Sequence, residues 1–278
     1  MKYPIGIQTF EQIINNGFVY VDKTDMVYAL ATEGKTYFLS RPRRFGKSLL
    51  LSTLRAYFEG KKELFKGLKI DKLEKDWHVH KVFHFDFNSV NFTQPNALEE
   101  TLDYELSQWE KEYGIEAEFK NQFGLRLEKI LQVAAEQTGH GAVVLIDEYD
   151  KPLLDVLEMD PELLNNNREI LKGFYSTFKK ADAYLRFVFL TGVTKFSQVS
   201  VFSGFNQPLD ISMAEKFEAL CGITEEELHT QFAEPIREMA QAENCTEEEM
   251  KLQLKKQYDG YHFSENMTDI YNPFSVLN

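Results

Sequence analysis

Cysteine is nearly absent from this chain. Only Cys221 and Cys245 occur among its 278 residues, without a Cys-x-x-Cys pair or a Cys/His cluster at zinc spacing. We therefore expect two reduced thiols and no disulfide framework. Long apolar runs are also missing, since the longest, residues 142–146 and 187–190, fall far below the roughly 20 residues that cross a bilayer. The N-terminus lacks the basic start and apolar run of a secretory signal, so we expect a cytoplasmic protein with no membrane span.

Positive charge is scarce as well. The 31 Lys and Arg are outnumbered by 44 Asp and Glu, which gives a formal net charge of −13. Such a field repels a phosphate backbone, so nucleic acid is not favoured as a partner of this portion unless a local basic patch escapes the average. Repeats, low-complexity tracts and Pro/Gly/Ser linkers are missing too. With 43% hydrophobic residues, the chain can bury the core of one large domain, alone or with a smaller appendage.

The hydrophobic pattern alternates between strands and helices. Apolar runs predict strands at 36–40, 82–87, 142–146 and 186–191, and helical spacing predicts helices at 47–58, 97–112, 118–137 and 161–181. Uninterrupted apolar strands between helices favour an α/β fold with a central parallel sheet covered on both faces. From about Ser212 acidic helices take over, with capping boxes at 224–227 and 246–249. We therefore divide the chain into residues 1–211 and a smaller helical region, 212–278.

A candidate phosphate-binding loop lies between the first strand and its helix. Gly46-Lys47-Ser48 supplies backbone amides at a helix start, a lysine for the outer phosphates and a hydroxyl for Mg²⁺. The alternative is a surface turn with a chance Gly-Lys-Ser, which the strand-to-helix setting disfavours. The residues expected to bind nucleotide are Arg41, Arg43, Arg44, Phe45, Gly46, Lys47, Ser48 and Leu49.

The loop departs from the general G-x-x-x-x-G-K-[ST] pattern because Arg41 stands where glycine is expected. Arg41 and Pro42 imply a slightly different loop path. Arg41, Arg43 and Arg44 place positive charge beside the expected phosphates. They could neutralise the nucleotide or pair with acidic neighbours such as Asp150, and the sequence does not decide between the two.

Carboxylates follow the strand at 142–146. Asp147 and Glu148 at the end of an apolar strand form a Walker B arrangement, in which Asp147 would hold Mg²⁺ together with Ser48 and Glu148 would polarise the attacking water. The alternative is that these acids merely end a strand in solvent. After the strand at 186–191, Thr191 and Thr194 are candidates to sense the γ-phosphate, or hydroxyls that cap the next turn. His78 and His80 alternate on a possible strand, without a third metal ligand nearby in sequence.

The stretches RPRRFGKS, LIDEYDKP, TGVTKFSQVSVFSGFN, YDGYHF and YNPFSVLN, with the N-terminal GFVYVDKT, resemble the bacterial and archaeal AAA-ATPase-like family. The match runs from about residue 4 to the end and includes the arginine at the first loop position. The resemblance implies an ASCE-type P-loop NTPase domain followed by a helical or winged-helix-like region. Many members carry a further domain similar to PD-(D/E)XK nucleases, but these residues contain no candidate nuclease site.

The expected activity is ATP hydrolysis with Mg²⁺, with Lys47, Glu148 and Thr191 as catalytic residues and Ser48 and Asp147 at the metal. The alternative is a nucleotide-dependent switch that contacts an unknown protein partner or a second copy of itself and turns over slowly. A small-molecule kinase fits less well, because the Asp-Glu pair suits water activation and no acceptor-binding motif is apparent.

Overall fold

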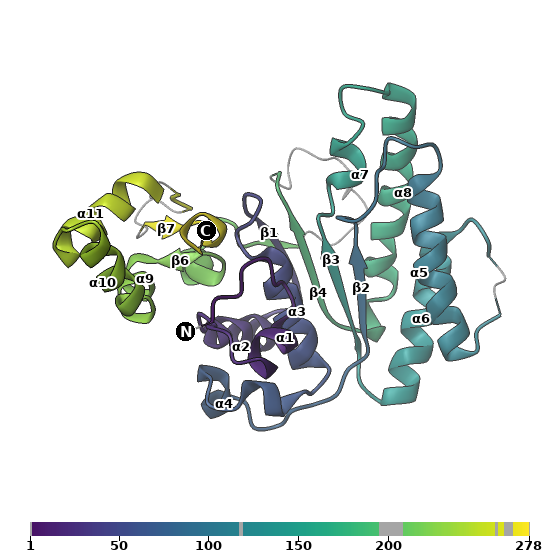
Figure 1. The fold of residues 1–278 in the computed structure, drawn as a ribbon. Coiled ribbons are helices and arrows are strands. Elements are labelled where there is room, and N and C mark those ends of the chain that lie inside the picture. Colours follow the sequence, from purple (N-terminus) through teal and green to yellow (C-terminus); the bar gives the residue numbers. More distant parts are fainter. Residues whose placement is uncertain (1, 117–118, 195–207, 259–260, 264–268, 278) are drawn as a thin grey trace.

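A five-stranded parallel sheet forms the centre of the molecule, in the strand order β2-β3-β4-β1-β5. The computed structural model describes residues 2–116, 119–194, 208–258, 261–263 and 269–277 (Figure 1). The strands are β1 (Thr36–Ser40), β2 (Val82–Asp86), β3 (Ala142–Asp147), β4 (Leu185–Gly192) and β5 (Leu209–Asp210). Because all five run parallel, their carboxyl ends share one edge of the sheet.

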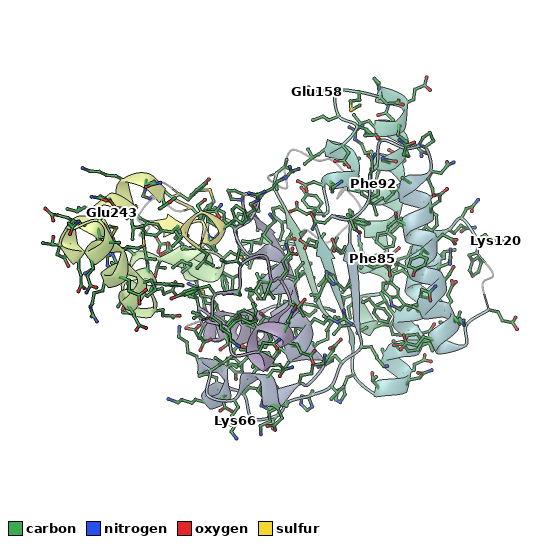
Figure 2. All side chains as sticks on the ribbon, viewed as in Figure 1. Lys66, Phe85, Phe92, Lys120, Glu158 and Glu243 are labelled. Atoms are coloured by element: carbon green, nitrogen blue, oxygen red, sulfur yellow. The ribbon has the colours of Figure 1, made fainter. Side chains whose placement is uncertain are left out.

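Both faces of the sheet are buried, as the uninterrupted apolar strands predicted. Successive residues of a strand point to opposite faces. On β3, Val144 and Ile146 pack into one cluster, and Val143 and Leu145 pack into the other. Figure 2 shows Phe85 between the sheet and its helices, and Phe85 is buried.

Helices cover the two faces in separate groups (Figure 1). One group contributes the large apolar side chains of the first cluster: α5 (Ala97–Tyr113), α6 (Phe123–Thr138), α7 (Lys151–Leu154), α8 (Pro161–Lys180) and η2 (Asp182–Tyr184). The other group packs into the second cluster: α1 (Phe10–Asn15), α2 (Thr24–Glu33), α3 (Lys47–Phe58), η1 (Lys62–Phe65), α4 (Lys69–Leu73) and η5 (Glu215–Leu220).

A smaller C-terminal lobe lies beyond the second group of helices (Figure 1). Its elements are β6 (Ile223–Thr224), α9 (Glu225–Gln231), α10 (Ala233–Ala242), α11 (Glu247–Tyr258), β7 (Ile270–Tyr271) and α12 (Pro273–Leu277). β6 and β7 pair antiparallel, and the lobe has an apolar cluster of its own. The division at 211/212 stays a prediction, and Phe217 beyond it packs with the sheet cluster.

The predicted elements agree with the structure to within a few residues, with two corrections. The helix predicted from residue 118 begins at Phe123. His78 and His80 precede β2, which begins at Val82, so they are not strand residues. Both predicted capping boxes are present, at Thr224 and Thr246. Within the described residues, no helix has the length and apolarity that a bilayer crossing requires.

Candidate functional site

The candidate site lies at the carboxyl edge of the sheet, where β1, β3 and β4 end beside the start of α3. The loop of residues 41–46 follows β1. At its start, Arg41 N–H donates a hydrogen bond to the Gly192 carbonyl at the end of β4 (3.2 Å). The chain then enters α3 at Lys47. The loop therefore lies between a buried strand and a helix, as the sequence predicted, and Arg41, Phe45 and Lys47 are buried in it.

Two residues of this loop have a left-handed backbone. Gly46 has φ 94° and Arg44 has φ 67°. Glycine adopts this region freely, whereas arginine does so at a cost. The first hydrogen bond of α3 runs from Leu50 N–H to the Gly46 carbonyl (3.0 Å). The preceding amides, those of Lys47, Ser48 and Leu49, have no acceptor within the helix, and such amides form an anion-binding terminus.

Asp147 is the centre of the polar network. Its Oδ2 accepts a hydrogen bond from Ser48 Oγ (2.5 Å), and its Oδ1 accepts one from Thr191 Oγ1 (2.6 Å). The side chain is 1% exposed. Asp147 therefore does not end its strand in solvent, and it joins the hydroxyls of α3 and β4 through one carboxylate.

Glu148 and Lys47 form a buried ion pair beside Asp147. Lys47 Nζ lies 3.0 Å from Glu148 Oε1 and also donates to the carbonyls of Arg41 (3.0 Å) and Pro42 (3.3 Å). Burial raises the pKa of the Glu148 carboxyl, the Lys47 ammonium opposes this, and the nearby Asp147 and Asp150 reinforce it. Glu148 also has a positive φ of 55°, the kind of strained backbone that concentrates at functional sites.

The donor set at Asp147 fits Mg²⁺. A hydroxyl and a carboxylate are the hard oxygen ligands that Mg²⁺ prefers, and the ion is usually held by one or two carboxylates together with substrate phosphates. The described part of the chain contains no group of three or more His, Cys, Asp or Glu that could hold a metal ion. Ser48 and Asp147 are the residues that would hold the ion, together with phosphate oxygens of a bound nucleotide.

The guanidinium of Arg41 contacts backbone carbonyls of the protein. Nη1 donates to the carbonyls of Ser40 (2.9 Å) and Ser212 (2.7 Å), and Nη2 donates to those of Phe217 (3.4 Å) and Glu218 (3.3 Å). The guanidinium also lies 4.0 Å from the centre of the Phe263 ring. Asp150 is not its partner. Nucleotide binding by Arg41 stays a prediction. In this structure its guanidinium contacts backbone carbonyls and the Phe263 ring.

Arg43, Arg44 and Phe45 differ in their surroundings. Both arginines are exposed, and the Arg44 guanidinium lies 4.0 Å from the Phe274 ring centre. Phe45 is buried. Its ring packs edge-on against those of Tyr261 and Phe263, at centroid distances of 4.7 and 5.4 Å.

A cavity of about 600 Å³ opens over the loop. Arg43, Arg44 and the residues from Phe45 to Leu50 line one part of it, together with Glu148. Other parts of the wall come from segments that the sequence did not assign to the site, and their residues include Pro4, Ile5, Ile7, Val21, Lys23, Ile223, Phe232, Phe274 and Leu277. Some of these belong to the stretches GFVYVDKT and YNPFSVLN, whose residue types alone give no chemical signal.

The remaining candidates lie apart from this network. Thr194 donates from N–H and Oγ1 to Asp150 Oδ2 (2.8 and 2.5 Å), which fits the turn-capping alternative, whereas Thr191 contacts Asp147. His78 and His80 lie near His140, at ring distances of 5.0 and 5.4 Å from it. Residues 195–207, which hold most of TGVTKFSQVSVFSGFN, lie outside the described residues.

Comparisons with known proteins bear on the family of the chain. A family described as "Predicted AAA-ATPase" matches residues 4–202. An uncharacterized protein from the vnfD 5′ region of Azotobacter chroococcum mcd 1 is 39% identical over 281 residues, which cover 99% of this chain and 51% of that protein. The chain thus spans about half the length of this relative.

The structure of the Aeropyrum pernix ORC1 protein in complex with DNA aligns with 74% of this chain and 45% of its own, at a TM-score of 0.36 and 14% identity. At that score the likeness carries no argument. The parallel sheet, the loop before α3 and the family match together identify a P-loop NTPase fold. The chain belongs to the predicted AAA-ATPase family.

Proposed function

We propose that this domain binds ATP with Mg²⁺ and hydrolyses it. The observation that carries the proposal is the convergence of Ser48 and Thr191 on the two oxygens of Asp147, beside the Lys47–Glu148 pair. Residues of α3, β3 and β4 thus bring a hydroxyl pair, a cation and two carboxylates to one sheet edge. This set suits phosphoryl transfer, which depends mainly on positioning and charge stabilisation.

Lys47 is the residue that would respond most directly to the nucleotide. Its side chain is 4% exposed, and its ammonium is held by Glu148 and two loop carbonyls. Phosphate oxygens at the start of α3 would compete for it, assisted by the amides of Ser48 and Leu49. Once Lys47 turns to phosphate, the Glu148 carboxylate is released from its partner.

Glu148 would then orient the attacking water. Its carboxylate lies beside Asp147, which with Ser48 would hold Mg²⁺, and the metal would neutralise charge on the phosphates. Thr191 would keep Asp147 in place through the 2.6 Å hydrogen bond. The apolar part of the cavity wall, with Ile5, Val21 and Phe232, would receive the base.

Phosphate release by Glu148→Gln tests the hydrolysis step. Glutamine keeps the side-chain shape but removes the charge, so we expect ATP binding to survive and turnover to fall by roughly 10²-fold or more. The matched control is Glu158→Gln, because Glu158 is an exposed glutamate that does not line the cavity. Equal turnover by Glu148→Gln and the wild type would refute the assignment.

A nucleotide-dependent switch is the second candidate, and the cavity favours it. The wall contains residues of the sheet domain, such as Ser48, and of the C-terminal lobe, such as Phe232 and Leu277. A bound nucleotide would therefore contact both parts and could change their relative position. A rise in melting temperature with ATP and Mg²⁺, without phosphate release from the isolated protein, would support the switch, whose partner would be another protein or a second copy.

A further inference from the structure

We propose that four residues after α11 position the phosphate-binding loop for nucleotide. We call them the clamp residues: Tyr261, Phe263, Asn272 and Phe274. The proposal rests on the nucleotide binding proposed above and deepens it, because it assigns a role to a part of the chain that supplies no phosphate ligand.

Each clamp residue contacts a side chain or carbonyl of the loop. The Phe274 ring lies under the Arg44 guanidinium at 4.0 Å, and Asn272 Nδ2 donates to the Arg43 carbonyl (3.4 Å). The rings of Tyr261 and Phe263 both pack edge-on against the ring of Phe45. Three consecutive loop residues are therefore held from one side, by residues more than 200 positions away in the sequence.

The clamp residues are themselves fixed to the fold. Ile270 N–H donates to the Tyr261 carbonyl (3.3 Å), and Ile270 is fully buried against the sheet cluster. Asn272 Oδ1 accepts from Phe274 N–H (3.0 Å), which sets the direction in which the ring leaves the backbone. The contacts to the loop thus come from an anchored strand end.

The loop needs such support because Arg44 has φ 67°. A left-handed arginine costs free energy and persists only where the surroundings hold it. This conformation, with that of Gly46, sets the direction of the amides that enter α3. The Arg44–Phe274 contact offsets the cost, so the clamp favours the loop shape that binds phosphate. A cation–π contact of this kind corresponds to about a two- to tenfold change in affinity.

The test measures ATP binding by Phe274→Leu in the full chain. We expect the Kd to rise about two- to tenfold. Phe274→Tyr keeps the ring and is expected to bind as the wild type does. Phe119→Leu is the matched control, because Phe119 is 40% exposed, as Phe274 is, and lies between α5 and α6.

Phe274→Leu is also tested in an Arg44→Gly protein, which distinguishes an effect on the loop conformation from a general loss of packing. Arg44→Gly removes both the strain and the guanidinium, so Phe274→Leu is expected to have no further effect there. Amide hydrogen exchange of the loop, measured without nucleotide, is expected to speed up in Phe274→Leu and not in Phe119→Leu.

The possible results separate the two proposals. Wild-type binding together with an unchanged Kd and unchanged loop exchange in Phe274→Leu overturns the clamp and leaves nucleotide binding intact. An equal loss in Phe119→Leu, or the same loss in the Arg44→Gly background, also overturns the clamp. A wild-type protein that binds no ATP overturns both proposals.

Discussion

Replacing Arg41 by glycine places the residue of the general phosphate-loop pattern at this position, and we expect it to destabilise the protein. The Arg41 side chain joins the start of the loop to the carbonyls of Ser212, Phe217 and Glu218 and to the Phe263 ring. Burial lowers the pKa of its guanidinium, opposed by the nearby Cys221, Asp210 and Glu218. Removing it leaves buried carbonyls without their donor.

The size of the loss follows from the contacts. The two shortest hydrogen bonds, to Ser40 and Ser212 at 2.9 and 2.7 Å, involve a charged donor and are worth about 1.5 kcal/mol each. The cation–π contact with Phe263 adds about 1 kcal/mol. Arg41→Gly is therefore expected to lower the free energy of unfolding by about 4 kcal/mol, which lowers Tm by roughly 10 °C.

Urea unfolding of the nucleotide-free protein measures this effect. Arg43→Gly is the control, because Arg43 is exposed and contacts the lobe through its carbonyl, which glycine retains. We expect Arg43→Gly to stay within about 0.5 kcal/mol of the wild type. An Arg41→Gly variant that is fully stable but binds ATP poorly would refute the reasoning, since it would place Arg41 with the nucleotide.

Two further predictions concern the titration of Glu148 and the ion pair between Lys23 of the sheet domain and Glu227 of the C-terminal lobe. An ordinary glutamate has a pKa of about 4.3. Burial raises the pKa of Glu148, so its carboxylate becomes protonated at a higher pH than that of an ordinary glutamate. kcat/KM should therefore fall as the pH drops through this raised pKa, and a pH profile whose acidic limb stays in the ordinary range would contradict it. Glu227 accepts from Lys23 at 2.5 Å, so Glu227→Gln should cost roughly 1.5–3 kcal/mol in urea unfolding. The pair of Glu225 and Lys255 is more exposed, with side chains 34% and 37% exposed. Glu225→Gln is therefore the control, with an expected loss of under about 1 kcal/mol. Equal losses in the two variants would argue against a special role for the Lys23 pair.

Local chemistry made the central elements predictable. Apolar runs bounded by polar residues specify the strands, and Gly46 marks the point where the loop turns into α3. The pairing of Asp147 with Ser48 follows from the same logic, because parallel strands bring their carboxyl ends together. The strand-ending pair therefore indicated a candidate metal and water site at this edge of the sheet, although the sequence left open that the two acids lie in solvent.

Contacts between distant segments were not predictable. Arg41 donates a hydrogen bond to the carbonyl of Ser212, 171 residues away. No local sequence pattern indicates whether the Arg41 side chain contacts other parts of the protein or a bound nucleotide. β5 has only two residues, too few for a hydrophobic period to appear. His78 and His80 alternate like strand residues, yet they lie in an irregular segment before β2, because an alternation of so few residues does not specify a strand.

Equilibrium binding of ATP to the wild type and to Lys47→Ala, with and without Mg²⁺, tests the central claim most directly. Lys47 is the one loop side chain that pairs with Glu148, and its removal leaves the amides in place but takes away the charge. We predict Mg²⁺-dependent binding by the wild type and a loss of at least about tenfold in Lys47→Ala. Equal affinity of the two proteins, or no binding by either, would contradict a phosphate-binding function for this loop.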